Sequence, residues 1–252
     1  MLAQHSGDEP AVGRPNMPGL VNEIEVSRRT SLVQHSVLFS GIPARECREI
    51  VFAAHEKQFA RRQTIYLEGD PVGHMILMTS GCAKIVQFGQ NGSEVILCLR
   101  GAGEVVGTAG LRPHGRHCSM AQALSVSTAL IWESAIFESF LQRSLPLRRN
   151  ITHILCQQLQ ELEERYREIS TERVAARLSH QLVRLLNQVG RRVNGSVEIS
   201  LSREELAQLT GTTLFTVSRL LSGWNKKGIV STRREAVAVH NLQALAELAE
   251  SE

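Results

Sequence analysis

Residues 199–230 read ISLSREELAQLTGTTLFTVSRLLSGWNKKGIV, and this stretch predicts two short helices joined by a turn. Ser202 begins an S-x-x-E capping box with Glu205, which marks the first turn of a helix. Gly211 suits the turn because glycine accepts a positive φ without steric cost, and Thr212 can cap the second helix. Two helices joined in this way form a helix-turn-helix, whose second helix enters the major groove of DNA.

The expected second helix has two different faces. Apolar residues recur at steps of three and four, as in a buried helical stripe: Val217, Leu220, Leu221 and Trp224. The opposite face carries Phe215, Arg219 and Lys226, and an aromatic ring beside two cations is unusual on an ordinary solvated face. These side chains can contact thymine methyl groups, guanine edges and phosphates. We therefore interpret the segment as a DNA-recognition helix.

A hairpin is expected directly after this helix. Residues 228–230 and 236–239 are β-prone runs around a charged tip, which is the pattern of a wing. Arginines at the tip would lie near the sugar-phosphate backbone. The predicted DNA-contacting residues are Ser202, Arg203, Thr212, Thr213, Leu214, Phe215, Ser218, Arg219, Ser222, Lys226, Arg233 and Arg234.

The distribution of charge supports this interpretation. The whole chain has 28 Lys and Arg residues against 25 Asp and Glu residues, a formal net charge of only +3. Residues 170–240 hold 11 basic and 5 acidic residues, whereas the remainder holds 17 basic and 20 acidic residues. The cationic excess therefore lies in the segment expected to contact DNA.

Length and composition limit the class of protein. The 252 residues are 42% hydrophobic and 21% charged, which supports one large or two ordinary folded domains. No run of apolar residues is long enough to span a membrane, and the N-terminus lacks the pattern of a secretion signal. Five cysteines, with no C-x-x-C pair, are typical of reduced thiols, so we expect a cytoplasmic protein that does not bind membranes.

A change of periodicity near Gln58 predicts a second kind of structure. Residues 28–57 read as helical with a break at 41–43, but from 58 to 132 short β-prone runs alternate with glycine turns. Asn91-Gly92 is a strong signal for a tight hairpin. The pattern predicts an antiparallel sandwich or barrel, with a last strand over residues 124–132.

After Ser144 the pattern predicts a long helix. Two seven-residue series, offset by four, run along it: Thr152, Leu155, Leu159, Leu162, Tyr166 and Ile169. Such a seam is typical of paired helices, although it covers fewer than three heptads and is also compatible with packing on its own domain. Because a helix-turn-helix usually reads two half-sites about 34 Å apart, we expect the seam to form a homodimer.

In the order of its parts the chain resembles the CRP/FNR superfamily of regulators over residues 30–240. The resemblance is carried by residues 67–70 (LEGD), 80–81 (SG), 103–107 (GEVVG), 206–207 (LA), 211 (G), 216–219 (TVSR) and 228–230 (GIV). It implies an α+β chain in which a β-roll like a cyclic-nucleotide-binding jelly roll precedes a long dimerisation helix and a winged helix-turn-helix. It also implies a homodimeric transcription regulator whose effector signal passes through a hinge near Ser170, with double-stranded DNA and RNA polymerase as partners. The expected boundaries are a flexible tail over 1–27, the roll over 28–144, the dimerisation helix over 145–169 and the DNA-binding domain over 170–252.

Two departures from the family pattern affect the ligand and the bases read. Cyclic-nucleotide-binding members carry a glutamate where this chain has Thr108, and an arginine–serine pair where it has Cys118-Ser119. A buried phosphate without that arginine lacks charge compensation, which argues against cyclic AMP even though Arg112 and Arg116 lie in the same loop. Phe215 replaces a recognition-helix glutamate of many members, so more apolar base contact is expected.

Other cofactors are left open by the sequence. No cysteine precedes Cys47, which argues against an iron–sulfur cluster of the N-terminal kind. Haem remains a candidate, but scattered histidines in a loop are also typical of a polar surface. The candidate axial ligands are His74, His114 and His117, with Cys82 or Cys118. We assign no metal ligand and leave the effector unidentified.

An enzyme is not expected. Glycines at 101, 103 and 107 resemble a nucleotide-binding loop, but no helix is predicted behind them. The sequence has no G-x-S-x-G, H-E-x-x-H or P-loop motif. The alternative function is a ligand-binding module whose C-terminal domain contacts protein rather than DNA. A steep salt dependence of binding to random duplex separates the two hypotheses.

Overall fold

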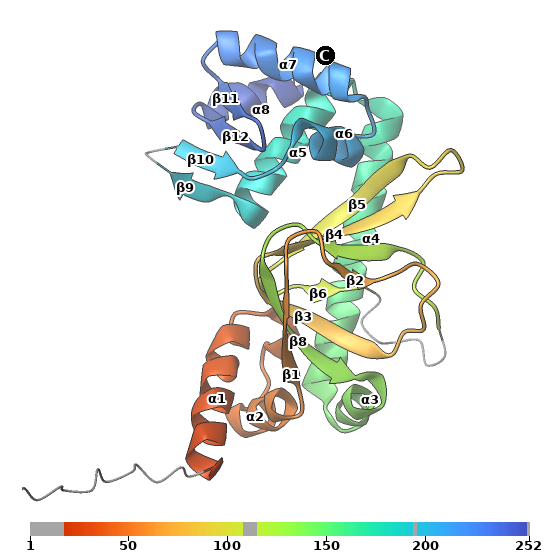
Figure 1. The fold of residues 1–252 in the computed structure, drawn as a ribbon, viewed down its shortest axis with the longest axis vertical. Helices are drawn as coiled ribbons and strands as arrows, with labels where there is room; N and C mark the ends of the chain where they lie inside the picture. The colour runs from red at the N-terminus through yellow and green to blue at the C-terminus, as the bar shows by residue number, and fades with distance from the viewer. Residues whose placement is uncertain (1–17, 108–114, 194–195, 251–252) are drawn as a thin grey trace, which may run out of the picture.

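The molecule is elongated, with a β-roll between two helical parts (Figure 1). The computed structural model describes residues 18–107, 115–193 and 196–250. At one end of the roll lie α1 (Pro18–Val33), η1 (Val37–Phe39), α2 (Ala44–Phe52) and α3 (Ser134–Arg143). The C-terminal domain lies at the other end, and the long helix α4 (Leu145–Thr171) runs beside the roll toward it.

The roll consists of two four-stranded antiparallel sheets. One sheet has the order β1-β8-β3-β6 and the other β2-β7-β4-β5. The strands are β1 (His55–Phe59), β2 (Thr64–Tyr66), β3 (His74–Ser80), β4 (Cys82–Phe88), β5 (Glu94–Gly101), β6 (Val105–Val106), β7 (Met120–Ala123) and β8 (Ser127–Glu133). Alanines and β-branched residues, with Phe59, Tyr66 and Met78, fill the space between the sheets, as expected where two inner faces interdigitate.

The N-terminal helices pack on the outer face of the first sheet. Trp132 on β8 is fully buried among them, and its indole Nε1 donates to the carbonyl of Ile50 on α2 at 2.7 Å. Phe39 and Phe137 pack against the same indole ring. The buried Trp132 ring, whose N–H has a hydrogen-bond acceptor on α2, therefore helps to hold these helices on the roll.

The C-terminal domain combines a small sheet with four helices. Its sheet has the order β11-β12-β10-β9, in which β11 and β12 form the expected hairpin. The helices are α5 (Val174–Val189), α6 (Arg203–Thr210), α7 (Leu214–Lys226) and α8 (Leu242–Glu250); the strands are β9 (Arg191–Val193), β10 (Ser196–Ile199), β11 (Val230–Arg233) and β12 (Ala236–Val239). We call the β11–β12 hairpin the wing.

Two expectations about secondary structure are wrong. The tail expected to be flexible over 1–27 is helical from Pro18 onward, and Glu25 on α1 pairs with Arg28 and Arg29. These i,i+3 and i,i+4 pairs support a helix directly after Pro18 and Gly19. Residues 1–17 lie outside the described chain. The strand expected over 124–132 begins only at Ser127, because residues 124–126 form a bend that leaves Val126 75% exposed.

No helix of the described residues is both long and apolar enough to cross a membrane.

Alanine substitutions at Gly81 and Gly92 would test whether the tight turns of the roll need glycine. Both have positive φ values, of 75° and 77°. A Cβ at Gly81 would lie 2.6 Å from the carbonyl oxygen of Val126 and 2.7 Å from the Cα of Ser127, whereas one at Gly92 would meet nothing within 4 Å. Gly92→Ala should therefore lower the free energy of unfolding by about 1–2 kcal/mol through backbone strain alone. Gly81→Ala should lower it by about 2–5 kcal/mol, because overlap with backbone atoms adds to the strain. Urea unfolding followed by circular dichroism measures both, and equal losses would contradict this account.

Candidate nucleic-acid interface

The first helix of the pair begins as the sequence predicts. The Ser202 hydroxyl accepts from the backbone N–H of Glu205 at 3.1 Å, and the Glu205 carboxylate accepts from the backbone N–H of Ser202 at 2.7 Å. This is a complete capping box. Gly211 ends α6 with φ 62° and ψ 44°, so the turn needs the left-handed conformation expected of it. The turn thereby sets the direction in which α7 leaves.

The second helix is capped by Thr213 and not by Thr212. The Thr213 hydroxyl accepts from the backbone N–H of Thr216 at 3.2 Å. The backbone N–H of Thr212 is instead used to close α6, since it donates to the carbonyl of Ala207 at 3.1 Å. The turn between α6 and α7 is therefore one residue longer than the sequence predicted, and the prediction that Thr212 caps α7 is wrong.

The two faces of α7 divide as expected. Val217, Leu221 and Trp224 are buried in the domain core. Phe215 is 76% exposed and Leu214 is 51% exposed, although large apolar side chains are more often buried. The other polar candidates also reach the surface, with Arg219, Ser222 and Lys226 exposed and Ser218 half-buried. A large aromatic ring left in solvent at the start of a helix is available for contact with another molecule.

The arginines around the wing differ in how firmly they are held. Arg203 at the start of α6 donates from Nη2 to the Thr232 hydroxyl at 3.0 Å, which joins α6 to the wing. Its Nε atom is buried with no hydrogen-bond partner among the described residues. Arg233 pairs with Glu198 at 3.4 Å, whereas Arg234 is exposed and forms no ion pair with any described residue.

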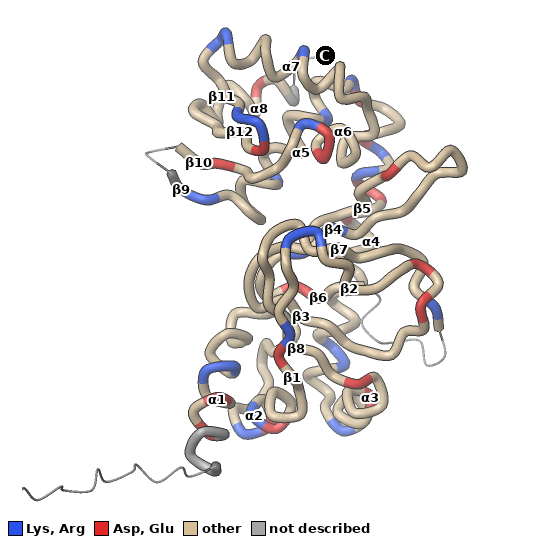
Figure 2. The backbone as a smooth tube through the Cα atoms, in the orientation of Figure 1, with Lys and Arg blue, Asp and Glu red and all other residues tan. Residues whose placement is uncertain are grey.

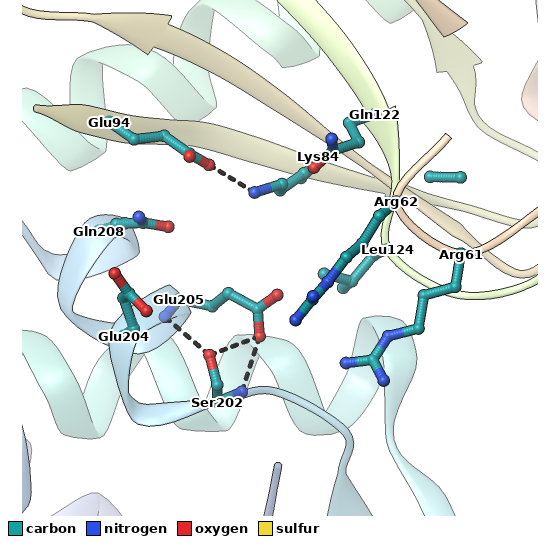
Figure 3. Close-up of a pocket in the computed structure, with 11 residues that line it drawn as sticks. Arg61, Arg62, Lys84, Glu94, Gln122, Leu124, Ser202, Glu204, Glu205 and Gln208 are labelled. Atoms are coloured by element: carbon teal, nitrogen blue, oxygen red, sulfur yellow. Dashed lines mark hydrogen bonds and ion pairs between the residues drawn. The ribbon is translucent and has the colours of Figure 1, made fainter. Parts of the chain in front are cut away.

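The start of α6 faces the roll, an arrangement that the sequence interpretation missed. Arg61 and Arg62 extend from the roll toward Ser202 and Glu205, and they line a pocket of about 250 Å³ between the two domains (Figure 3). Arg61 also pairs with Glu235 on the wing at 2.9 Å. These partners are 174 residues apart in sequence, and no local pattern links them.

The α4 seam is exposed in the single chain. Leu155, Leu159, Leu162, Tyr166 and Ile169 are between 37% and 74% exposed, and Thr152 is also exposed. A neighbouring face of α4 is held by the roll through Arg100, which donates to Glu161 at 3.0 Å. The helix therefore has one face on its own roll and an apolar stripe without cover among the described residues.

The hinge between α4 and α5 is fixed by charged side chains. Arg184 on α5 makes two bonds to the Glu168 carboxylate on α4, at 2.5 and 2.7 Å. Burial opposes ionisation of Glu168, but the hydrogen bonds and charge of Arg184 prevail and lower its pKa. Glu172 lies 3.0 Å from His180, and with Glu168 the two form a group of three potential metal ligands. Because Glu168 is already occupied by a guanidinium, we assign no metal to this group.

The roll buries two of the candidate ligands, His117 and Cys82. His117 is buried and stacks on Tyr66 with ring centroids 3.6 Å apart, and burial lowers its pKa. Burial also raises the pKa of Cys82 to about 12, which keeps the thiol protonated. Within the described chain His74, His117, Cys82 and Cys118 do not form a three-ligand group. Thr108, Arg112 and His114 lie outside the described residues.

Two family models match the chain. Residues 172–248 match the model of the Crp-like helix-turn-helix domain. Residues 56–144 match the model of the cyclic nucleotide-binding domain. The first match includes α5 to α7 and the wing, and the second includes most of the roll.

The curated proteins to which this chain is similar include regulators of transcription and of electron transport. The "CRP-like cAMP-activated global transcriptional regulator" of Mycobacterium tuberculosis is 22% identical over 83% of this chain and 94% of its own length. Electron transport regulator A of Shewanella oneidensis is 26% identical over 76% of this chain and 78% of its own length.

Solved structures share the fold. FixK2 of Bradyrhizobium japonicum has a TM-score of 0.70 and 21% identity, over 79% of this chain and 98% of that one. A transcriptional regulator of the CRP/FNR family from Thermus thermophilus has a TM-score of 0.68 and 20% identity, over 78% and 99% of the two chains.

Arg219 tests whether α7 reads bases. Its exposed guanidinium can form two hydrogen bonds with a guanine edge. On a duplex selected from a random pool, Arg219→Ala should weaken binding by about 1–3 kcal/mol and leave binding to random duplex nearly unchanged. Fluorescence anisotropy at fixed salt measures both. Equal losses on the two duplexes would show that Arg219 contacts phosphate only.

Proposed function

Because this chain belongs to the CRP/FNR superfamily of transcription regulators, we propose that it acts as a homodimer that reads a two-fold symmetric DNA site through α7. The observation that carries the proposal is the exposed pair Phe215 and Arg219 on a helix whose other face is buried. A guanidinium beside an apolar ring fits a guanine edge next to a thymine methyl group. Thr213, Ser218 and Lys226 complete a polar border that can position the backbone.

The homodimer is proposed from the α4 seam. Its apolar side chains are half exposed or more in most cases, and a second copy of the same seam would bury them. Two copies of α7 related by a twofold axis would then face successive major grooves on one side of the duplex. The same DNA-bound homodimer would thus cover both the exposed seam and the exposed recognition face.

Control is assigned to the roll, through an effector other than cyclic AMP or without an effector. Cys118-Ser119 stand where the family pattern has an arginine–serine pair. Tyr66 and His117 stack beside Gly107, where an added Cβ would lie 2.9 Å from the Tyr66 hydroxyl. The Tyr66 ring therefore lies next to the roll glycine, and neither Tyr66 nor His117, whose pKa is lowered by burial, supplies a fixed cation for a cyclic phosphate. Haem remains a candidate ligand of the roll.

The remaining partners follow from the same proposal. We propose RNA polymerase as the partner through which the DNA-bound regulator acts, and a cytoplasmic location, which the five scattered cysteines without a C-x-x-C pair support. Among the named relatives the described activities are regulatory, and no enzymatic activity is proposed for this chain.

A substitution at Leu159 tests whether the α4 seam forms a homodimer. Leu159→Glu should shift the protein toward monomer, because a carboxylate at the centre of the seam would be buried without a partner. The same change should weaken binding to a duplex with two half-sites far more than binding to a duplex with one. Sedimentation equilibrium and anisotropy measure the two effects.

The matched control is Gln160→Glu, which adds the same charge at an exposed position beside the seam. It should leave assembly and binding unchanged. A wild-type protein that is monomeric, or that binds single and paired half-sites with equal affinity, would refute the proposed function.

Cyclic AMP tests the effector assignment. Isothermal titration of cyclic AMP into the full-length protein should show no binding, and the nucleotide should leave affinity for the selected duplex unchanged. The reason is the missing phosphate-binding arginine at Cys118. Saturable binding that also tightens the DNA complex would contradict the assignment. A Soret band in freshly purified protein would instead identify haem.

A further inference from the structure

The start of α7 presents apolar side chains and no acidic group. Leu214 and Phe215, the first two residues of the helix, are both more than half exposed, and α7 lies along the outer edge of the C-terminal domain (Figure 1). The helix reads LFTVSRLLSGWNK, so it carries only basic and uncharged residues (Figure 2). A carboxylate is the group that accepts a hydrogen bond from the N4 amino group of cytosine. The helix therefore lacks the side chain that selects cytosine most directly.

The polar groups nearest to this end of α7 are engaged within the protein. The Thr213 hydroxyl accepts from the backbone N–H of Thr216, and the two threonine hydroxyls lie 3.0 Å apart. Ser202 and Glu205 bond each other in the capping box of α6. The Phe215 ring, by contrast, stacks on no ring or cation of the described residues. The largest group available to a base at this end of the helix is therefore an apolar ring.

Arg219 lies one helical turn beyond Phe215 on the same face of α7. Residues four apart on a helix have Cβ atoms about 5–6 Å apart, and successive base pairs are stacked about 3.4 Å apart. Arg219 is exposed and forms no ion pair with any described residue. Its guanidinium can therefore bind a guanine edge while the Phe215 ring reaches the pyrimidine of the neighbouring base pair.

The apolar group that a pyrimidine presents in the major groove is the methyl group on C5. Thymine carries this group and cytosine does not. In 5-methylcytosine the same group is attached to the same ring carbon. Contact with an aromatic ring removes the apolar surface of both partners from water. Such a contact distinguishes cytosine from the other two bases, but it does not distinguish thymine from 5-methylcytosine.

We propose that Phe215 determines specificity by binding the C5 methyl group of a pyrimidine beside the guanine contacted by Arg219. The chain then accepts thymine or 5-methylcytosine at this position and rejects unmethylated cytosine. The inference rests on the proposed function, because it concerns the bases that α7 contacts. Methylation of a cytosine at this position raises the affinity of the regulator for its site. A modification of the DNA thus acts as a signal that the recognition helix itself detects.

The experiment changes one methyl group of the DNA at a time. Each thymine of a duplex selected from a random, unmodified pool is replaced in turn by deoxyuridine, which lacks only the C5 methyl group. At the thymine that responds, the base pair is then changed to 5-methylcytosine·guanine and to cytosine·guanine, which differ from each other in the same group. Fluorescence anisotropy at fixed salt measures the affinity of the full-length protein for every duplex.

Four variants assign the effect to a side chain. Phe215→Ala removes the exposed ring, and Phe215→Leu keeps an apolar contact at the same position. Leu242→Ala removes another exposed apolar side chain, from α8, and is the matched control. Phe215→Glu places a carboxylate where it can accept from the N4 amino group of cytosine.

The wild-type protein should lose about fourfold in affinity per half-site when the methyl group is removed, a factor that corresponds to about 0.8 kcal/mol for one buried carbon group. The loss should be similar for thymine against deoxyuridine and for 5-methylcytosine against cytosine. Phe215→Ala should bind the two members of each pair equally, Phe215→Leu should keep part of the difference, and Leu242→Ala should behave as wild type. Phe215→Glu should prefer the cytosine·guanine pair to the thymine·adenine pair.

Three outcomes overturn the inference. Equal binding of every thymine and deoxyuridine duplex by the wild-type protein shows that no methyl group is read. A methyl dependence that persists in Phe215→Ala assigns the contact to another side chain. A loss in Phe215→Ala that is equal on all duplexes places the ring against the sugar-phosphate backbone. In each case a wild-type preference for the selected duplex over random duplex leaves the proposed function intact, whereas a protein without that preference overturns both.

Discussion

The arrangement of this molecule depends on one part-buried guanidinium. Arg165 on α4 donates to the carbonyl of Leu97 on β5 and, at 2.6 Å, to the carbonyl of Leu209 on α6. It therefore joins the roll, the long helix and the helix-turn-helix through backbone atoms, whose positions vary little. No carboxylate among the described residues forms an ion pair with it, and burial lowers its pKa from the usual value. A desolvated cation held only by neutral carbonyls is costly unless its acceptors stay in place. Movement of α4, β5 or α6 alone would therefore break a hydrogen bond of Arg165 and leave its charge without an acceptor.

Apolar packing reinforces the same junction. Ile96 and Leu99 on β5 belong to one buried cluster with Leu206 and Leu209 on α6, so the core of the DNA-binding domain continues into the roll. The hinge adds the Glu168–Arg184 pair one turn further along the same face of α4. A signal that altered β5 would thus reach α6 through direct contacts, without a long chain of intermediates. The seam on α4 borders this junction at Leu162 and Ile169, yet both side chains stay more than half exposed.

The sequence predicted the parts of the fold that are determined by neighbouring residues. The capping box at Ser202, the left-handed Gly211 and the buried stripe of α7 follow from chemistry within four residues, and each is confirmed. The shift of the second cap from Thr212 to Thr213 shows the limit of this reasoning. Two adjacent threonines can both cap a helix, and the choice depends on which N–H the preceding helix uses.

Contacts between distant segments could not be predicted in the same way. In the sequence Arg165 is one charge among many beside the seam, and its role becomes visible only when β5 and α6 are brought to it. The Arg61–Glu235 pair joins a roll turn to the wing across 174 residues. The charge balance of the sequence gave no indication of this pair, because Arg61 lies in the part outside 170–240, which has an acidic excess. Net charge describes a domain as a whole, whereas an ion pair depends on charges within about a Debye length of 8–10 Å. An arginine on the turn between β1 and β2, in the part of the chain with an acidic excess, can therefore pair with a carboxylate on the wing of the basic C-terminal domain.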